Sequence, residues 1–239
     1  MMENVAILVD GGFYLKRARM IWGEKSAEDR AEELISHCRA HLWNGPYECK
    51  DHLYRIFYYD CPPSSLRPYH PLLKKQIDLA KTGLYSWMTK FQEELRSKRK
   101  VALRLGELTT ENTYYTLKPD SVKKLFTGTQ KLEDMKEEDF LLTIGQKGVD
   151  MRIGLDIASM AYKKQVTKMV LISGDSDFVP AAKLARREGI DFVLDPMWAK
   201  IKDSLNEHID GLRSPRPKKD ETKGTLHMYC AKSDAVVEE

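Results

Sequence analysis

Acidic side chains at the ends of apolar runs are the residues of this sequence with the clearest chemical use. Asp10 ends the run NVAILVD, and Asp175 and Asp177 follow the run VLIS with one residue between them. Asp150 opens a helical pattern in QKGVDMRIGLDIASMA. Carboxylates gathered at one place repel each other unless a cation neutralises them, and oxygen ligands in this number suit Mg²⁺ or Mn²⁺. The pattern therefore predicts a divalent-metal site.

The segments that must position these acids alternate between strand and helix patterns. Short apolar runs rich in branched and aromatic residues predict strands, and apolar residues three or four apart predict helices. The expected strands are residues 4–10, 52–60, 101–108, 167–173 and 190–196. The expected helices are residues 13–22, 27–42, 72–100 on both sides of Gly83, 149–164 and 177–188. This alternation favours a single α/β domain with a mainly parallel sheet, whose functional crevice lies at the carboxyl ends of the strands.

Local sequence adds detail around two of the acids. Two glycines follow Asp10, and we expect them to let the backbone turn sharply and to leave the carboxylate open to a ligand. At about 100° per residue, Asp150 shares a helix face with Ile153, so we expect Asp150 to point inward and away from bulk water. Asp156 lies on the flank of the same stripe.

The same acids also have ordinary structural interpretations. An aspartate at a helix start is a common N-cap, which could apply to Asp150, Asp175 or Asp177. An aspartate that ends a strand often forms a turn, and we favour that interpretation for Asp60 and Asp195. The metal hypothesis therefore depends on the joint pattern and not on any single residue.

Three blocks of the sequence together resemble a known family. AILVDGGFYLKR, QKGVDMRIGLDIASMA and LISGDSDFVPAAKLARREGI are similar to the signature blocks of the NYN domain family, a branch of the PIN-like metal-dependent ribonucleases. The resemblance covers about residues 4–209, with the blocks in the expected order. It implies a PIN-like three-layer α/β/α sandwich with a central, mainly parallel sheet and an acidic pocket at one sheet edge.

The resemblance also implies an activity, an endoribonuclease that depends on Mg²⁺ or Mn²⁺. The metal would activate water and orient the scissile phosphate. The residues that it marks as catalytic and metal-binding are Asp10, Asp150, Asp175 and Asp177, with Asp156 as a further candidate acid. Asp177 would bind a second ion or orient the water. Many relatives have an asparagine shortly after the first aspartate, whereas this chain has Gly12 and Phe13, which puts it in a variant group.

Basic residues close to these acids are candidates for contact with an RNA backbone. Lys147 and Arg152 bracket Asp150, and Lys16 and Arg17 follow Asp10. Cations beside an acidic pocket would hold the phosphates of the substrate strand. RNA is therefore the expected partner, and its identity, association with a second copy of the chain and any protein partner are left open.

Two other functions are alternatives to the ribonuclease. A catalytically weak PIN-like module could bind RNA or a protein, but such a module has little reason to bear the repulsion among four acids. A phosphatase with an aspartyl nucleophile needs an acid two residues after its first aspartate, and this chain has Gly12 there. The set of acids favours the nuclease.

A histidine- and cysteine-containing segment approximates a zinc pattern. His37 and His41 are spaced for one helix face, and Cys49 and His52 follow with two residues between them. The segment lacks a paired-cysteine knuckle, which structural zinc sites commonly contain. We expect these residues to be partly buried in a helix and a loop instead.

The amino-acid composition limits the classes of protein to which this chain can belong. The chain has 239 residues, 42% of them hydrophobic and 31% charged, which is typical of a soluble globular protein. Its apolar runs are far shorter than the roughly 20 residues that span a bilayer, so no membrane association is expected. Four cysteines without a CxxC motif favour a reduced, cytoplasmic location. A net charge of +3 permits contact with nucleic acid without arguing for it.

We expect one domain over residues 1–212 and a tail after it. Residues 109–140 interrupt the strand–helix alternation and are interpreted as an insertion in the domain. Residues 213–239 are rich in proline and charge and have little to bury, so they are expected to form a disordered tail.

Overall fold

The computed structural model describes residues 3–43, 51–215 and 229–230. The chain divides into two compact units, which are described separately. The first comprises Met1–Asp60, Lys90–Leu105 and Gly148–Glu239, and the second comprises Cys61–Thr89 and Gly106–Lys147. All four candidate aspartates lie in the first unit.

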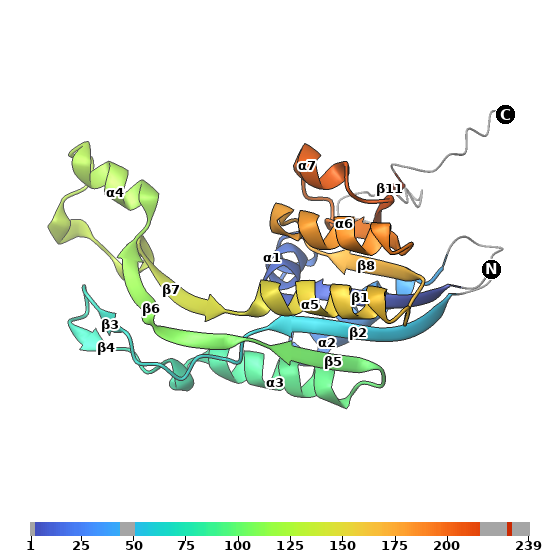
Figure 1. The fold of residues 1–239 in the computed structure, drawn as a ribbon. Coiled ribbons are helices and arrows are strands. Elements are labelled where there is room, and N and C mark those ends of the chain that lie inside the picture. The colour runs from blue at the N-terminus through green and yellow to red at the C-terminus, as the bar shows by residue number, and fades with distance from the viewer. Residues whose placement is uncertain (1–2, 44–50, 216–228, 231–239) are drawn as a thin grey trace, which may run out of the picture. The chain divides into compact units, whose positions relative to one another are not determined.

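A twisted sheet of seven strands forms the centre of the first unit (Figure 1). Its order is β11-β10-β9-β8-β1-β2-β5, and neighbouring strands are parallel except for β10 and β11. The strands are β1 (Asn4–Asp10), β2 (His52–Asp60), β5 (Val101–Leu105), β8 (Lys168–Ile172), β9 (Asp191–Asp195), β10 (Gly211–Ser214) and β11 (Tyr229–Cys230). The predicted α/β class with a mainly parallel sheet is confirmed.

Helices cover both faces of this sheet and complete a PIN-like three-layer sandwich. The helices are α1 (Gly11–Trp22), α2 (Ala27–Ala40), α3 (Gly83–Ser97), α5 (Val149–Tyr162), α6 (Val179–Arg187) and α7 (Asp203–Asn206). In Figure 1, α5 and α6 lie on one face of the sheet, and α1 and α2 lie on the other. Alternate residues of β1 are buried towards opposite layers, which is why this strand has an unbroken apolar sequence.

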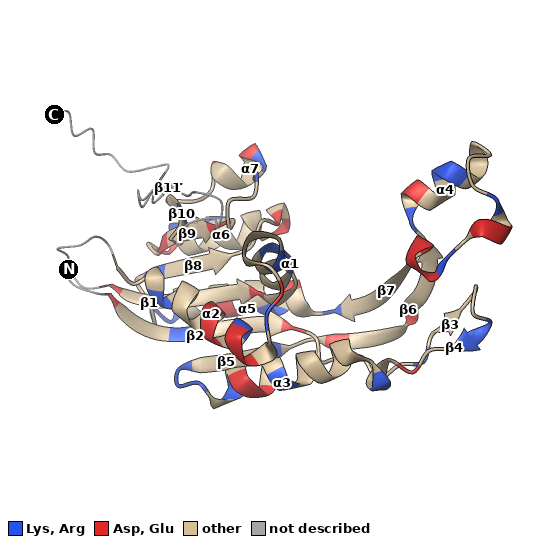
Figure 2. Cartoon of the chain, turned by 180° about the vertical axis from the view of Figure 1, so that it is seen from behind, with Lys and Arg blue, Asp and Glu red and all other residues tan. Residues whose placement is uncertain are grey.

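Ion pairs join α2 to the part of α3 that belongs to the first unit. Lys90 pairs with Glu28, and Lys98 pairs with Glu32. Figure 2 shows acidic and basic residues interspersed along both helices. This surface is therefore mixed in charge and does not form a basic patch for nucleic acid.

The second unit is built on an antiparallel ladder of two strands. The ladder joins β6 (Glu107–Leu117) to β7 (Phe140–Lys147), and a smaller hairpin joins β3 (Tyr69–His70) to β4 (Lys75–Gln76). Along the chain, η1 (Leu79–Lys81) follows β4, and α4 (Pro119–Phe126), η2 (Leu132–Asp134) and η3 (Glu137–Asp139) lie between β6 and β7. The imidazole of His70 is buried, with ring centroids 4.4 Å from Tyr115 and 5.0 Å from Phe140.

The structure differs from the expected elements in three places. Residues 72–82 do not form an α-helix: they contain β4 and the short 3-10 helix η1, and α3 begins only at Gly83. The expected strand 101–108 is divided between β5 and β6. The ordered chain continues beyond residue 212, because Arg213 and Ser214 belong to β10. Apart from residues 213–215 and 229–230, the predicted tail lies outside the described residues.

No helix in the described part of the chain combines the length and the apolar character that crossing a membrane requires.

Candidate active site

The topology of the sheet brings three segments to one edge. The segment after β1 forms α1 on one face of the sheet, whereas the segment after the neighbouring strand β8 forms η4 (Ser176–Phe178) and α6 on the other face. Such a switch between neighbouring parallel strands opens a crevice at their carboxyl ends. Asp10 is the last residue of β1, and Asp175 and Asp177 follow β8. The N-terminus of α5 brings Asp150 to the same edge, where it lines one pocket together with Asp177.

Asp10 is both a helix cap and the most enclosed of the four acids. Its Oδ1 accepts the backbone N–H of Phe13 at 3.0 Å, and its Oδ2 accepts the hydroxyl of buried Ser173 at 3.1 Å. Burial raises the pKa of Asp10 from its ordinary value, and the nearby charges of Asp150 and Asp175 raise it further. The two hydrogen bonds oppose this shift. The Asp10 carboxylate is thus held in one orientation, close to the other acids.

The cap interpretation accounts for two of the acids and leaves two unexplained. Asp175 caps η4, since its Oδ1 accepts the backbone N–H of Asp177 at 3.0 Å. Asp150 does not cap α5, because the residue before that helix is Gly148, at φ 81°. The Asp177 carboxylate lies within η4 and caps neither that helix nor α6. Asp150 and Asp177 therefore cap no helix, although each lies in the first turn of one, where the helix dipole favours an acidic side chain.

Asp150 is more exposed than the helical phase predicted. We expected it to point away from water, but it lies in the first turn of α5, where no preceding turn covers it. Partial burial raises the pKa of Asp150, and the charges of Asp175 and Asp177 add to that effect. Among the residues that the structure describes, none forms an ion pair with any of the four acids. No ion pair within the described residues therefore offsets the repulsion among these acids.

Gly11 and Gly174, which are next to Asp10 and Asp175 in the chain, leave room for large side chains. A Cβ on Gly11 would lie 2.5 Å from the Tyr58 hydroxyl oxygen, and a Cβ on Gly174 would lie 2.8 Å from Cε2 of Phe13. The predicted sharp turn at Gly11 is wrong, because α1 begins there directly. Glycine is required at position 11 because a Cβ there would clash with the Tyr58 side chain.

Asp156 and Arg17 are engaged in other interactions. The carboxylate of Asp156 accepts the hydroxyl of Tyr59 at 2.9 Å and pairs with the Arg104 guanidinium at 3.0 Å. The guanidinium of Arg17 donates from Nε and Nη2 to the carbonyl oxygen of Met197 at 3.1 and 2.6 Å. These contacts favour structural roles for both residues over direct roles at the site.

The other predicted cations are exposed. Lys16 lies on α1, and Arg152 lies on the first turn of α5 with Nε 3.9 Å from the position of a Cβ on Gly148. Lys147 ends β7 in the second unit. A cation that the sequence did not single out is Lys202, whose Nζ donates to the hydroxyl of Ser176 at 3.0 Å, between the two aspartates of the DSD sequence. No local pattern around Lys202 signals this contact, because it depends on the tertiary fold.

The four aspartates fit a hard divalent cation in donor type and charge. They offer only carboxylate oxygens, which Mg²⁺ and Mn²⁺ prefer. Within the described residues, the three possible ligands whose donor atoms all lie within 4.8 Å of one another are His37, His41 and Asp195. The four aspartates are spaced more widely, which suits an ion that keeps several of its waters.

The cluster of His37, His41 and Asp195 replaces the zinc pattern read from the sequence. Both histidines bring Nε2 to the same Asp195 oxygen, at 2.6 and 2.9 Å. Of the other two proposed zinc ligands, Cys49 lies outside the described residues and His52 is exposed with Nδ1 3.2 Å from Oδ1 of Asn4. The histidine spacing was visible in the sequence, but a partner more than 150 residues away was not.

Hydrogen bonding explains this cluster better than a metal does. The other oxygen of Asp195 accepts the backbone N–H of Met197 at 2.8 Å, which is the expected turn, and the hydroxyl of Ser214 at 2.6 Å. Metal-bound histidines usually donate their second ring N–H to a partner, and both Nδ1 atoms here are buried without one. Asp195 therefore ties β9 to α2 and β10.

A match to one family model supports the family assignment. The model of the NYN domain family matches residues 84–211, more than half of the chain, and that range contains Asp150, Asp175 and Asp177. A solved structure of a protein of unknown function from Vibrio parahaemolyticus is 14% identical, covers 88% of this chain and 91% of its own, and has a TM-score of 0.46. No curated protein matches this sequence.

Proposed function

Because the chain belongs to the NYN domain family, whose members are generally nuclease-like, we propose that it is a divalent-metal-dependent ribonuclease that hydrolyses phosphodiester bonds of RNA. The observation that carries the proposal is the pair Asp150 and Asp177. Neither caps a helix or pairs with a cation among the described residues, and partial burial together with the charges of Asp175 and Asp177 raises the pKa of Asp150. The helix N-terminus favours each of these acids singly, but it does not remove the repulsion between them, which a bound cation would offset.

Asp10, Asp150, Asp175 and Asp177 would hold Mg²⁺ or Mn²⁺. The ion, when bound, would lower the pKa of a coordinated water and stabilise the charge that develops on the phosphate oxygens. The chain's own residues supply orientation. The N–H of Phe13 and the hydroxyl of Ser173 fix the two oxygens of Asp10, so this ligand has little freedom to lose when a cation binds.

Cations around the acids would bind the phosphates of the strand. Lys202 is the best supported, because Ser176 holds its ammonium group beside the DSD sequence. Lys16 and Arg152 are exposed on the helices that start at the site. Lys147 is proposed for the same role only because it lies close to Asp150 in the sequence. Such contacts position a substrate without reading its sequence.

The test is cleavage of RNA by the purified protein in Mn²⁺, with Asp150→Asn and Asp177→Asn as variants. Each substitution keeps the side-chain volume and removes a charge that could hold the ion. We expect cleavage to fall by about 100-fold or more in each variant, as for other groups that stabilise transition-state charge. Sequencing of the product ends would report the preferred substrate.

The matched control is Asp191→Asn. Asp191 begins β9, so it lies at the opposite edge of the sheet, where it pairs with Lys168 at 3.1 Å. This variant should cleave as the wild type does. A protein that binds RNA but does not cleave it in Mn²⁺, with Asp150→Asn binding equally well, would instead be a catalytically weak RNA-binding module.

A further inference from the structure

An apolar stripe lies on the outer face of α5, on the side that does not belong to the buried core of the first unit. The α5 stripe consists of Met151, Leu155, Ala158 and Tyr162. Three of these side chains are large and exposed, Met151 to 70%, Leu155 to 63% and Tyr162 to 58%. Exposed apolar residues are ordinary when they are scattered singly, but a continuous row of them marks an interaction surface.

The spacing of the α5 stripe is that of a seam between two helices. Its successive members are four, three and four residues apart, which is the pattern with which one helix packs along another. None of the four side chains carries a charge, so a second apolar helix can cover them without burying an unpaired ion. The surface therefore fits a helix that carries a similar stripe.

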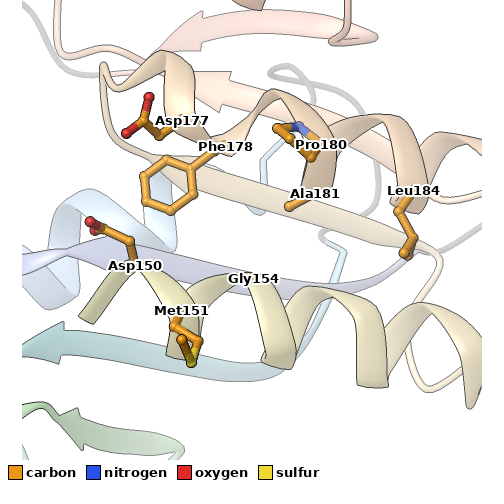
Figure 3. A pocket seen from close by; sticks show the side chains of 8 residues that line it. All are labelled: Asp150, Met151, Gly154, Asp177, Phe178, Pro180, Ala181 and Leu184. Carbon is orange, nitrogen blue, oxygen red and sulfur yellow. The ribbon is translucent and has the colours of Figure 1, made fainter. Parts of the chain in front are cut away.

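A groove adjoins the α5 stripe at the start of the helix. It lies between α5 and α6, has a volume of about 400 Å³, and has Asp150 and Asp177 among its lining residues (Figure 3). Met151 belongs to both the stripe and the groove. A Cβ on Gly154 would meet no atom within 4 Å, so this part of the groove has room for a side chain from outside.

We propose that a second copy of this chain covers the α5 stripe, with the two α5 helices packed antiparallel about a two-fold axis. In this arrangement Leu155 of each copy lies opposite Ala158 of the other, so a large side chain fills the space beside a small one. Tyr162 lies opposite Met151 of the second copy, next to the groove. A parallel pair would instead place the two Ala158 side chains opposite each other and leave a gap between the helices.

The charges at the two ends of α5 favour the same orientation. Asp150 lies in the first turn and shares the groove with Asp177, whereas Lys163 and Lys164 follow the last residue of the helix and are exposed. Neither lysine forms an ion pair within the described residues. Antiparallel packing brings the basic end of one copy towards the acidic end of the other, whereas parallel packing would bring acids towards acids. The second copy thus supplies positive charge on the side of the acidic cluster.

The expected contact is small. A stable interface buries about 800 Å² on each partner, and the exposed side chains of one helix of 14 residues, with the groove beside them, lie at the low end of this size class. The dimer should therefore be weak, with a dissociation constant on the order of 10 µM. Its formation depends on protein concentration and not on the proposed metal site.

Sedimentation equilibrium of the full chain, from about 1 to about 200 µM and without metal or RNA, tests the proposal. Wild type should pass from monomer to dimer over this range. Leu155→Glu places a charge from each copy in the seam and should weaken association by about tenfold or more. The matched control is Leu84→Glu, because Leu84 is also helical and 56% exposed but lies on α3 in the second unit. This control should dimerise as the wild type does.

Oxidative cross-linking tests the orientation. The double variant Leu155→Cys/Ala158→Cys should form a covalent dimer, because antiparallel packing places the two substituted positions of different copies within reach of a disulfide. Leu155→Cys alone should cross-link at least about fivefold more slowly. The wild type, treated in the same way, controls for the four cysteines of the chain. Faster cross-linking of the single variant would indicate parallel packing and overturn the proposed arrangement.

The proposal and the nuclease activity can fail separately. A wild type that stays monomeric at about 200 µM, or an equal loss of dimer in Leu155→Glu and Leu84→Glu, would overturn the α5 interface. Neither result bears on the nuclease, because the measurement contains no metal and no RNA. Circular dichroism checks the fold of each variant, and Tyr162→Lys tests the same seam if Leu155→Glu does not fold.

Discussion

Asp175 accepts a backbone N–H, whereas Asp150 accepts none among the described residues, so the two should respond differently to substitution. Asp150→Asn removes a like charge and no hydrogen bond. The metal-free variant should melt at the same temperature or up to about 2 °C higher, because repulsion in the cluster is relieved. Scanning fluorimetry with and without Mn²⁺ measures this, and the rise in melting temperature that Mn²⁺ gives the wild type should disappear.

The sequence predicted that the acids lie together, but it did not predict their surroundings. Strand ends are local signals, and they predicted that Asp10, Asp175 and Asp177 lie at one sheet edge. The exposure of Asp150 was predicted wrongly, because helical phase says little about a first turn that nothing precedes. The engagement of Arg17 with Met197 joins residues 180 positions apart, and no spacing rule reports such a pair.

Elements are held together at the end of β9 by one carboxylate. Asp195 accepts four hydrogen bonds while fully buried. Burial alone would raise its pKa, but the charge and the hydrogen bonds of His37 and His41 outweigh that effect and hold the pKa below its usual range. Asp195→Asn replaces one of the two acceptor oxygens with an NH₂ group, which cannot accept the hydrogen bonds that this oxygen receives. The substitution should lower the free energy of unfolding by about 2–4 kcal/mol.

Urea unfolding measures this loss, with Asp191→Asn as the surface control. Asp191 makes a partly exposed ion pair with Lys168, and its substitution should cost less than about 1 kcal/mol. Equal effects of the two substitutions would contradict the role of Asp195 as a tie between elements.

The same cluster should make the first unit sensitive to acid. Burial lowers the pKa of His41, so the native protein keeps it neutral at a pH where the unfolded chain protonates it. The unfolded state then binds more protons, and stability falls as pH drops below about 6.5, the ordinary value for histidine. Protonation of Asp195 adds to the loss only below its unfolded pKa of about 3.9. The free energy of unfolding, measured with urea, should therefore fall less between pH 7 and pH 5 in His41→Gln than in the wild type.

Helices and strands were predicted unevenly along the chain, for a physical reason. In the first unit, β1, β8 and β9 are largely apolar and buried, β2 is buried from residue 56 to residue 60, and the bounds of all four strands were predicted closely. Residues 72–82 carry apolar residues at helical spacing, yet they form a short hairpin and η1, with Lys74 at φ 51° in the turn. A short apolar run fits either structure, and tertiary pairing decided between them.

At the scale of the whole molecule, the tail should matter only where it touches the sheet. Ser214 donates to Asp195, and Arg213 donates to backbone carbonyls of Ala40 and His41. A chain that ends after Leu212 should therefore melt several degrees lower than one that ends after Pro215, because it loses these hydrogen bonds. Thermal melts of the two truncations measure the difference. Identical melting temperatures would show that β10 contributes nothing beyond residue 212.

The base of the β6–β7 ladder has an evolutionary consequence. Glu107 is paired with Lys147, so the chain departs from the end of β5 and returns to the start of α5 at adjoining points. A segment whose two ends adjoin can be lengthened, shortened or exchanged between lineages without moving the strands that carry the aspartates. Homologous chains should therefore vary most in length between these two positions, and each lineage could acquire its own accessory surface there while inheriting the same acids.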